Sequence, residues 1–220
     1  MPMLSRSEED HIKAVYALLQ DGESAFTKDI AERLRTKASS VTDMLKKLAE
    51  KGYLKHEPYY GAKLSAKGQS QALQLVRRHR LWETFLVDRL GFGWDEVHEV
   101  AEQLEHIASE KLIDKLDEYL GHPRFDPHGD PIPDKQGKLH ARKTRRLDAC
   151  DPGDQVRIVA VSGTTDGLLR LLDTKGLRIG TQLTVEVIHA FDGSIDIKPQ
   201  RGSAFSLSKD VSHHLQVEST

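Results

Sequence analysis

Apolar residues at helical spacing predict three helices at the N-terminal end of the chain, and an alternating pattern then predicts a hairpin. The first helix covers residues 8–19, and the second, residues 27–34, begins with a hydroxyl that we expect to cap it. The third begins at Ser39 and Ser40, which we also expect to act as caps. Two short strands follow within residues 53–68. This order of elements is that of a winged helix-turn-helix.

Farther along, the pattern predicts two long helices and then a small β-domain. One helix runs from about residue 66 to residue 90, and the next from 95 to 120, with Asp95 as its cap. A helical segment at 166–177 lies among short alternating stretches, which predict a small barrel. The predicted strands are residues 155–161, 182–190, 194–199, 204–208 and 214–218. The fold class is therefore mainly α with a C-terminal small β-barrel.

Composition is that of a globular protein with several small domains: 220 residues, 38% hydrophobic and 30% charged. Five of the eight prolines lie between Pro123 and Pro152, and together with "KLHARKTRR" they indicate an exposed basic linker rather than a packed element. Cys150 is the only cysteine, which excludes a disulfide framework within one chain. The sequence lacks an apolar run of membrane-spanning length and the apolar core of a signal peptide, so we expect a cytoplasmic protein with no membrane partner.

Charge is segregated along the chain, although the net charge is only −2. Residues 33–55 hold seven basic and two acidic side chains, whereas residues 95–118 hold nine acidic and two basic ones. The first segment favours a polyanion as partner, and the second favours cations.

The basic segment contains the second helix of the helix-turn-helix, whose N-terminal side chains reach base edges in the major groove while neighbouring groups hold phosphates. We therefore expect it to bind double-stranded DNA. The alternative is an amphipathic helix with a solvated basic face. The candidate DNA-binding residues are Thr27 at a helix start, Lys37, Ser39, Ser40, Thr42, Asp43 and Lys46 around the reading helix, and Tyr59, Tyr60 and Lys63 on the wing.

Histidine and carboxylate side chains gather on one side of the helix predicted at 95–120, in a sector about 100° wide beside its apolar stripe. Carboxylates brought together repel one another unless a cation joins them, so such a cluster predicts a divalent-metal site. The alternative is a solvated acidic surface. The candidate residues are His98, Glu102, Glu105 and His106 in that sector, His79 and Glu83 on one face of the preceding helix, and Asp10 on the first helix.

Enzymatic alternatives fail at specific residues, so we expect no enzyme. A zinc protease needs H-E-x-x-H, but here His98 and Glu99 are followed by Glu102 in the last position. The sequence has no phosphate-binding glycine loop and no nucleophile elbow. The remaining rival is a winged-helix regulator that responds to a signal other than a metal.

"HRLWETFL", "VHEVAEQLEHIASE" and "DPHGDPIP" together resemble the diphtheria-toxin-repressor family of metal-dependent transcriptional regulators, and more closely its manganese-responsive branch. The resemblance implies a homodimeric, metal-activated repressor of metal-uptake genes that binds a palindromic operator. It implies four domain segments: a winged helix-turn-helix at 1–75, a helical metal-binding and dimerisation domain at 76–140, a linker at 141–153, and an SH3-like domain at 154–220.

The same resemblance assigns the metal ligands. It implies a primary site of Asp10, Glu102, Glu105 and His106, and an ancillary site of His79, Glu83 and His98. Some members add a ligand from the SH3-like domain; Asp166 is our candidate, with a helix N-cap as its alternative role.

Three positions bear on the identity of the metal. Iron-responsive relatives carry Met and Cys at the positions of Asp10 and Glu102, and some manganese-responsive relatives carry Glu at the position of Lys13. Hard carboxylate oxygens suit Mn²⁺, while Fe²⁺ accepts the same ligand set. We therefore expect Mn²⁺ as the bound ion, with Fe²⁺ as the alternative.

Overall fold

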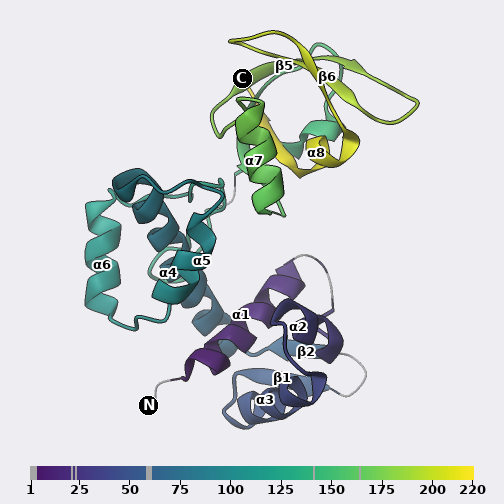
Figure 1. Cartoon of the computed structure of the whole chain (residues 1–220). Coiled ribbons are helices and arrows are strands. Elements are labelled where there is room, and N and C mark those ends of the chain that lie inside the picture. Colours follow the sequence, from purple (N-terminus) through teal and green to yellow (C-terminus); the bar gives the residue numbers. More distant parts are fainter. Residues whose placement is uncertain (1–3, 21, 23, 58–60, 141, 164) are drawn as a thin grey trace. The chain divides into compact units, whose positions relative to one another are not determined.

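Residues 4–20, 22, 24–57, 61–140, 142–163 and 165–220 are described by the computed structural model (Figure 1). The chain divides into two units, which are described separately. The first unit comprises Met1–His79, Glu102–Glu110 and Pro133–Lys138. The second comprises Arg80–Ala101, Lys111–Ile132 and Leu139–Thr220. No helix in the described part of the chain is long and apolar enough to cross a membrane.

The first unit contains the predicted winged helix-turn-helix. Its elements are α1 (Arg6–Gln20), α2 (Thr27–Arg33), α3 (Ala38–Glu50), β1 (Leu54–Glu57) and β2 (Gly61–Leu64). The two strands pair antiparallel, and Ala25 forms a bridge to Ala62 that fastens the start of α2 to the wing. The apolar stripes predicted from the sequence face a common core, with Ile12, Val15, Ile30, Val41, Leu45 and Leu48 fully buried.

The predicted caps of α2 and α3 are wrong by one to three residues. The N-cap of α2 is Phe26, held in an extended conformation directly after the bridged Ala25, so Thr27 is already the first helical residue. The N-cap of α3 is Lys37, which places Ser39 and Ser40 inside the first turn. Neither N-cap side chain makes a capping hydrogen bond. Tertiary pairing of the preceding backbone, rather than a capping hydroxyl, therefore sets where α2 begins.

The helix predicted at 66–90 is confirmed as α4 (Ala66–Leu90), but the helix predicted at 95–120 is two helices. They are α5 (Val97–Leu104) and α6 (Glu110–Tyr119), with Glu105 and His106 in the turn that ends α5. Asp95 lies before α5, and its carboxylate accepts a hydrogen bond from Arg170. Hydrogen bonds of Glu105 and His106 to residues of α1 and α4 override the helical periodicity here.

The C-terminal half of the second unit is a six-stranded antiparallel sheet in the order β3-β8-β4-β5-β6-β7. Because β3 and β7 are edges, the described strands form an open sheet and not the closed barrel that we expected. The five predicted strands and the predicted helix are present, while β3 and α8 were missed. The elements are β3 (Arg145–Arg146), β4 (Gln155–Val161), α7 (Asp166–Thr174), β5 (Gln182–Ile188), β6 (Ile195–Pro199), β7 (Phe205–Leu207), α8 (Lys209–His214) and β8 (Leu215–Ser219).

Part of the expected linker is packed. Arg145 and Arg146 form β3 at one edge of the sheet, and Leu147 and Cys150 just after it are buried in the sheet's core. A strand of two arginines has no alternation of apolar and polar residues, so it could not be predicted from the pattern.

The "DPHGDPIP" loop packs tightly on β4. The backbone N–H of Val161 donates to the carbonyl of His128 at 2.9 Å. Gly129 has φ +89°, and a Cβ on it would lie 2.0 Å from the carbonyl oxygen of Val159. Trp94 joins the core of the sheet and donates its indole N–H to Asp173.

Candidate metal centre and DNA-binding surface

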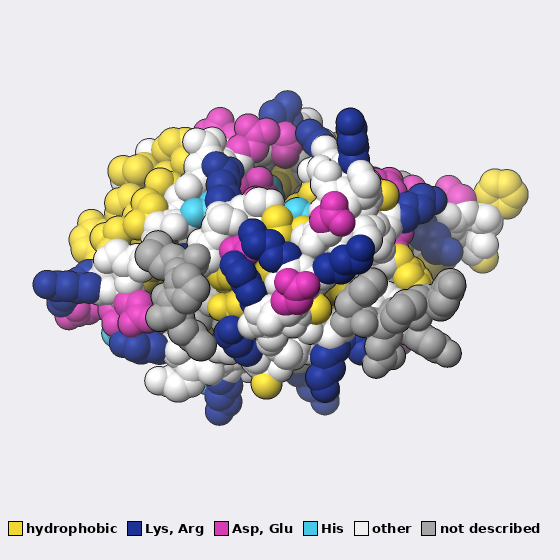
Figure 2. Space-filling model, turned by 90° about the horizontal axis from the view of Figure 1, so that it is seen from below, with side chains coloured by type: hydrophobic (Ala, Val, Ile, Leu, Met, Phe, Trp, Pro, Cys, Tyr) yellow, Lys and Arg dark blue, Asp and Glu magenta, His cyan; other side chains and the backbone are white. Residues whose placement is uncertain are grey.

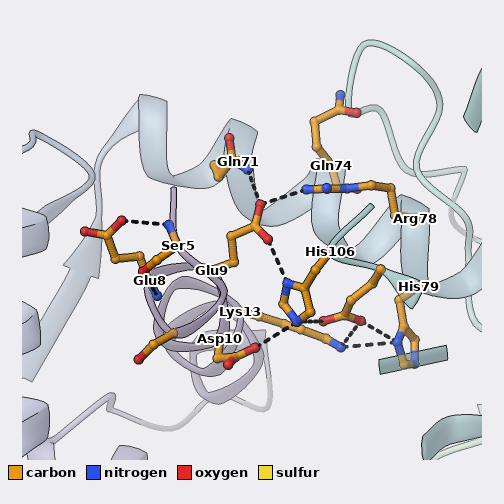
Figure 3. A network of polar contacts seen from close by, with 12 residues as sticks. Ser5, Glu8, Glu9, Asp10, Lys13, Gln71, Gln74, Arg78, His79 and His106 are labelled. Atoms are coloured by element: carbon orange, nitrogen blue, oxygen red, sulfur yellow. Dashed lines mark hydrogen bonds and ion pairs between the residues drawn. The ribbon is translucent and has the colours of Figure 1, made fainter. Parts of the chain in front are cut away.

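Three consecutive acidic residues of α1 take part in a network of polar contacts, in which Glu9 and Asp10 both contact His106 (Figure 3). Successive residues of a helix are turned by about 100°, so Glu8, Glu9 and Asp10 cannot share one face. Glu9 and Asp10 contact the two ring nitrogens of His106, whereas Glu8 contacts Lys47 and Lys51.

Asp10 meets Glu105 and His106 in a small cluster (Figure 3). One ligand atom from each of the three lies within 4.8 Å of the others. His106 Nε2 is 3.2 Å from Asp10 Oδ1 and 3.9 Å from Glu105 Oε1. Burial raises the pKa of Asp10, and the nearby charge of Glu105 adds to the rise against the opposing effect of His106. Two hard oxygens and an imidazole nitrogen at this spacing are a donor set that fits a divalent cation.

Glu9 holds the histidine of this cluster in place. Its Oε2 lies 2.7 Å from His106 Nδ1, and its Oε1 accepts a hydrogen bond from Arg78 of α4 at 3.1 Å. Because a carboxylate accepts only, Nδ1 carries the hydrogen and Nε2 is left as the ligating nitrogen, facing Asp10. Glu9 was not among the predicted site residues; an acidic residue next to a ligand on the same helix was the available signal.

Glu105 is almost completely buried and has two cationic or polar neighbours besides His106. Lys13 Nζ lies 2.6 Å from its Oε2, and His79 Nδ1 lies 2.6 Å from the same oxygen. Burial alone would raise the pKa of Glu105, but the hydrogen bond from His79 and the charge of Lys13 outweigh burial and lower it. Glu105 therefore stays ionised inside the protein.

Glu8 connects α1 to the C-terminal end of α3. Its Oε1 accepts from Lys51 at 2.5 Å and lies 3.1 Å from Lys47 Nζ, while its Oε2 accepts from the backbone N–H of Ser5. Burial would raise its pKa, but these hydrogen bonds, that of Lys51 foremost, lower it to about 2. The helix that carries Asp10 is thus tied to the helix predicted to read DNA.

A second cluster lies in the second unit around Glu83 of α4. His98 Nδ1 is 3.2 Å from Glu83 Oε1, and Glu83, Asp126 and His128 offer ligand atoms within 4.8 Å of one another. Burial, then the charges of Asp130 and Glu83, raise the pKa of Asp126 well above its usual value. Asp126 and His128 belong to the "DPHGDPIP" motif, but neither was predicted as a site residue.

The structure brings together some predicted ligands and not others. Asp10, Glu105 and His106 meet, and so do Glu83 and His98, with His79 one helical turn before Glu83 on α4. Glu102, in the last turn of α5, has an exposed side chain and is not in the first cluster. Asp166 is the exposed first residue of α7, whose N-cap is Thr165, and it belongs to no ligand cluster among the described residues.

Among the described residues, the predicted DNA-binding residues lie at the start of α2, on or just before α3, and on β2. Figure 2 shows many Lys and Arg side chains on the face that lies below in Figure 1, where α3 and β1 are drawn. Thr27 is half-buried at the start of α2, and the Thr42 hydroxyl donates to the carbonyl of Ala38. Tyr59 and Tyr60 lie outside the described residues. The exposed candidates are Lys37, Ser39, Ser40, Asp43, Lys46 and Lys63.

Three family models cover most of the chain. Residues 3–62 match the N-terminal DNA binding domain of the iron dependent repressor, and residues 65–134 match its metal binding and dimerisation domain. Residues 145–219 match the FeoA domain.

Similar proteins match between about two thirds and nearly all of the chain. The chain is 36% identical to the HTH-type transcriptional regulator MntR of Lysinibacillus sphaericus, over 65% of this chain and 98% of that protein. It is 29% identical to the iron-dependent repressor IdeR of Mycobacterium leprae, over 96% of each chain. A solved manganese-dependent transcriptional repressor in complex with manganese superposes with a TM-score of 0.87 at 35% identity, covering 97% of this chain and 100% of that one.

Proposed function

Since this chain belongs to the iron-dependent repressor family of metal-dependent DNA-binding proteins, we propose that it represses genes of metal homeostasis when Mn²⁺ is bound. The family consists of transcriptional repressors and not of enzymes. Because members of this family depend on a divalent metal, we disfavour the alternative, a winged-helix regulator that responds to a signal other than a metal. We place its action in the cytoplasm, on a palindromic DNA operator.

The observation that carries the proposal is the meeting of Asp10 from α1 with Glu105 and His106 from the turn after α5. We assign these three to the primary site, together with Glu102 one turn earlier on α5. We assign His79, Glu83 and His98 to an ancillary site, and Asp166 stays a candidate ligand for it. The two positive charges of a bound ion would offset the repulsion between the carboxylates of the primary site.

Mn²⁺ is favoured over Fe²⁺ by the hardness of the donors. Asp10, Glu105 and Glu102 are carboxylates, and oxygen-rich sites suit Mn²⁺, which binds nitrogen and sulfur ligands less tightly than later metals do. Among the similar proteins, one solved structure is described as a manganese-dependent repressor with manganese, whereas the mycobacterial relative is described as iron-dependent.

The chain's own residues link this site to α3. Glu9 and Arg78 hold His106, so the imidazole is fixed before any ligand arrives. On α1, Asp10 directly follows Glu8, which contacts the end of α3, and Glu9, which contacts α4. Restraining Asp10 against the turn after α5 therefore restrains α1, and α1 restrains the end of α3. We infer that metal binding favours the DNA-competent arrangement by this route.

Different metals should activate DNA binding to different degrees. The experiment selects a duplex from random DNA with the Mn²⁺-loaded protein and then measures its affinity with Mn²⁺, Fe²⁺, Co²⁺ and Zn²⁺ in parallel. We expect the Mn²⁺ response to occur within the range of free Mn²⁺ that saturates the primary site. A strong response to Zn²⁺ or Fe²⁺ with none to Mn²⁺ would contradict the assignment of the ion.

Lys46 is expected to contact a phosphate. Replacing it with Ala should weaken binding to all duplexes and flatten the dependence of log affinity on log salt by up to about 0.9, the contribution of one phosphate contact. Lys198→Ala, an exposed lysine of β6, is the matched control. The salt dependence is measured by fluorescence anisotropy, and an unchanged slope for Lys46→Ala would place this residue away from phosphate.

Dimerisation should use an exposed apolar surface formed by α4 and α6. Leu112 and Tyr119 of α6 are 41% and 63% exposed, and Tyr119 packs edge-on against Phe85 of α4. Figure 2 shows hydrophobic side chains gathered at the left edge, the side on which α6 lies in Figure 1. Two such faces would bury each other's apolar area in a symmetric dimer.

A charge in this surface should separate the protomers. We expect Leu112→Glu to raise the dimer dissociation constant by about tenfold or more, because it places an unpaired charge in an apolar interface. Leu171→Glu changes a similarly exposed leucine of α7 and is the control. Analytical ultracentrifugation measures both; equal dissociation constants would rule out Leu112 as an interface residue.

A further inference from the structure

Lys13 places a positive charge beside the candidate metal centre (Figure 3). It follows Asp10 by three residues on α1, so both side chains lie on the same side of that helix. Its Nζ is 2.6 Å from Glu105 Oε2 and 3.2 Å from His79 Nδ1. The Lys13 side chain is 22% exposed and that of Glu105 is 2% exposed, so this ion pair is largely shielded from water.

The two carboxylate oxygens of Glu105 have different neighbours. His79 Nδ1 lies 2.6 Å from Oε2 and must donate, since a carboxylate only accepts. Lys13 donates to the same Oε2 and cannot also donate to a nitrogen that carries its own hydrogen. Oε2 is thus held by two donors, while Oε1 is the oxygen nearer to His106 Nε2, at 3.9 Å.

We propose that Lys13 is a built-in cation of this centre, which neutralises Glu105 and thereby sets how tightly the centre binds a divalent ion. The inference rests on the proposed function, because it takes Asp10, Glu105 and His106 as the ligands. It concerns the strength of metal binding and applies equally to every divalent cation, because it acts through charge and not through the kind of donor atom.

The charge balance gives the direction of the effect. Asp10 and Glu105 together carry two negative charges, and the ammonium of Lys13 offsets one of them at hydrogen-bond distance from Glu105. Removing this charge leaves both carboxylates to attract the ion, so affinity should rise. It also leaves a buried carboxylate with one donor fewer, so the metal-free protein should become less stable. A lysine with a purely structural role would show only the second effect.

The test compares Lys13→Met with Lys198→Met, which makes the same change at an exposed position of the sheet. Both are made in a His98→Ala background, so that the second cluster contributes less to binding. Free Mn²⁺ is followed by the intensity of its electron paramagnetic resonance signal, and stability is followed by urea unfolding in chelator.

We expect Lys13→Met to bind Mn²⁺ more tightly, on the order of tenfold, and to unfold at lower urea than Lys198→Met when metal is absent. Unchanged or weaker Mn²⁺ affinity in a folded Lys13→Met protein overturns the proposal. If Lys13→Met does not fold, Lys13→Gln replaces it. Gln keeps a donor for Glu105 without the charge, and the same tightening is required of it.

A third variant separates this inference from the proposed function. His106→Ala should lose Mn²⁺ binding whether position 13 is Lys or Met. If His106→Ala binds Mn²⁺ as well as its parent does, the centre itself is wrong. If His106→Ala loses Mn²⁺ binding but the Lys13 variants bind Mn²⁺ no more tightly than their parent, the assignment of the metal centre is supported and only the role of Lys13 is refuted.

Discussion

Replacing His106 with Ala should abolish Mn²⁺-activated operator binding, with a loss of affinity of at least about hundredfold. Even the outer partners of metal ligands are worth about 10- to 100-fold in metal affinity, and His106 is the nitrogen donor itself. It is also the residue that Glu9 and Arg78 hold in position against Asp10. Without it, Glu105 is the one ligand of the cluster left in the turn after α5 to share an ion with Asp10 of α1.

The matched control for this prediction is His189→Ala, which removes an exposed histidine paired with Asp196 in the sheet. Operator affinity is measured by fluorescence anisotropy at saturating Mn²⁺, with circular dichroism as the check on folding. A folded His106→Ala protein with the operator affinity of the control would show that His106 is not a ligand.

The second large effect is expected at Gly129, in the loop that packs on β4. Its φ is +89°, and an added Cβ would lie 2.0 Å from the Val159 oxygen, which leaves no room for a side chain. Gly129→Ala should therefore lower the free energy of unfolding by about 3 kcal/mol, from overpacking together with backbone strain.

Gly153→Ala separates these two causes. Gly153 has a similar φ of +94°, but nothing lies within 4 Å of the added Cβ. Gly153→Ala should lower the free energy of unfolding only by the contribution of backbone strain, about 1 kcal/mol. Urea unfolding followed by tryptophan fluorescence measures both variants, since Trp94 is buried in the sheet's core. Equal losses of unfolding free energy in the two variants would mean that the loop moves to accommodate the Cβ at no cost and does not pack tightly on β4.

The elements with a strong periodicity of apolar residues could be predicted from the sequence. The 25-residue α4 and the winged helix-turn-helix have apolar stripes long enough to identify them, and the stripes of α1 and α3 face the core as expected. The strands of the sheet alternate clearly, but whether they close into a barrel depends on edge pairing, which no local pattern records. The two-residue β3 is too short to leave a pattern.

The failures lie where tertiary contacts compete with local preference. The helix predicted through Glu105 ends at Leu104, because Glu105 and His106 bind partners on α1 and α4. Helical periodicity placed Glu102 on the same side as Glu105; Glu102 lies in the last turn of α5 with an exposed side chain, and its role as a ligand stays a prediction. Glu9 had no signal of its own beyond its place next to Asp10, because its role depends on Arg78, far away in the sequence.

The most direct test of the central claim is operator affinity measured with and without Mn²⁺ on the same preparation. The protein is stripped of metal with a chelator, and affinity for the selected duplex is measured before and after saturating Mn²⁺ is restored. Glu8, on the same helix as Asp10, contacts Lys51 at the end of α3, and a bound ion would join Asp10 to Glu105 and His106 in the turn after α5. We therefore expect restored Mn²⁺ to raise the affinity for the operator by about hundredfold or more. Equal affinity in chelator and in Mn²⁺ would contradict the account.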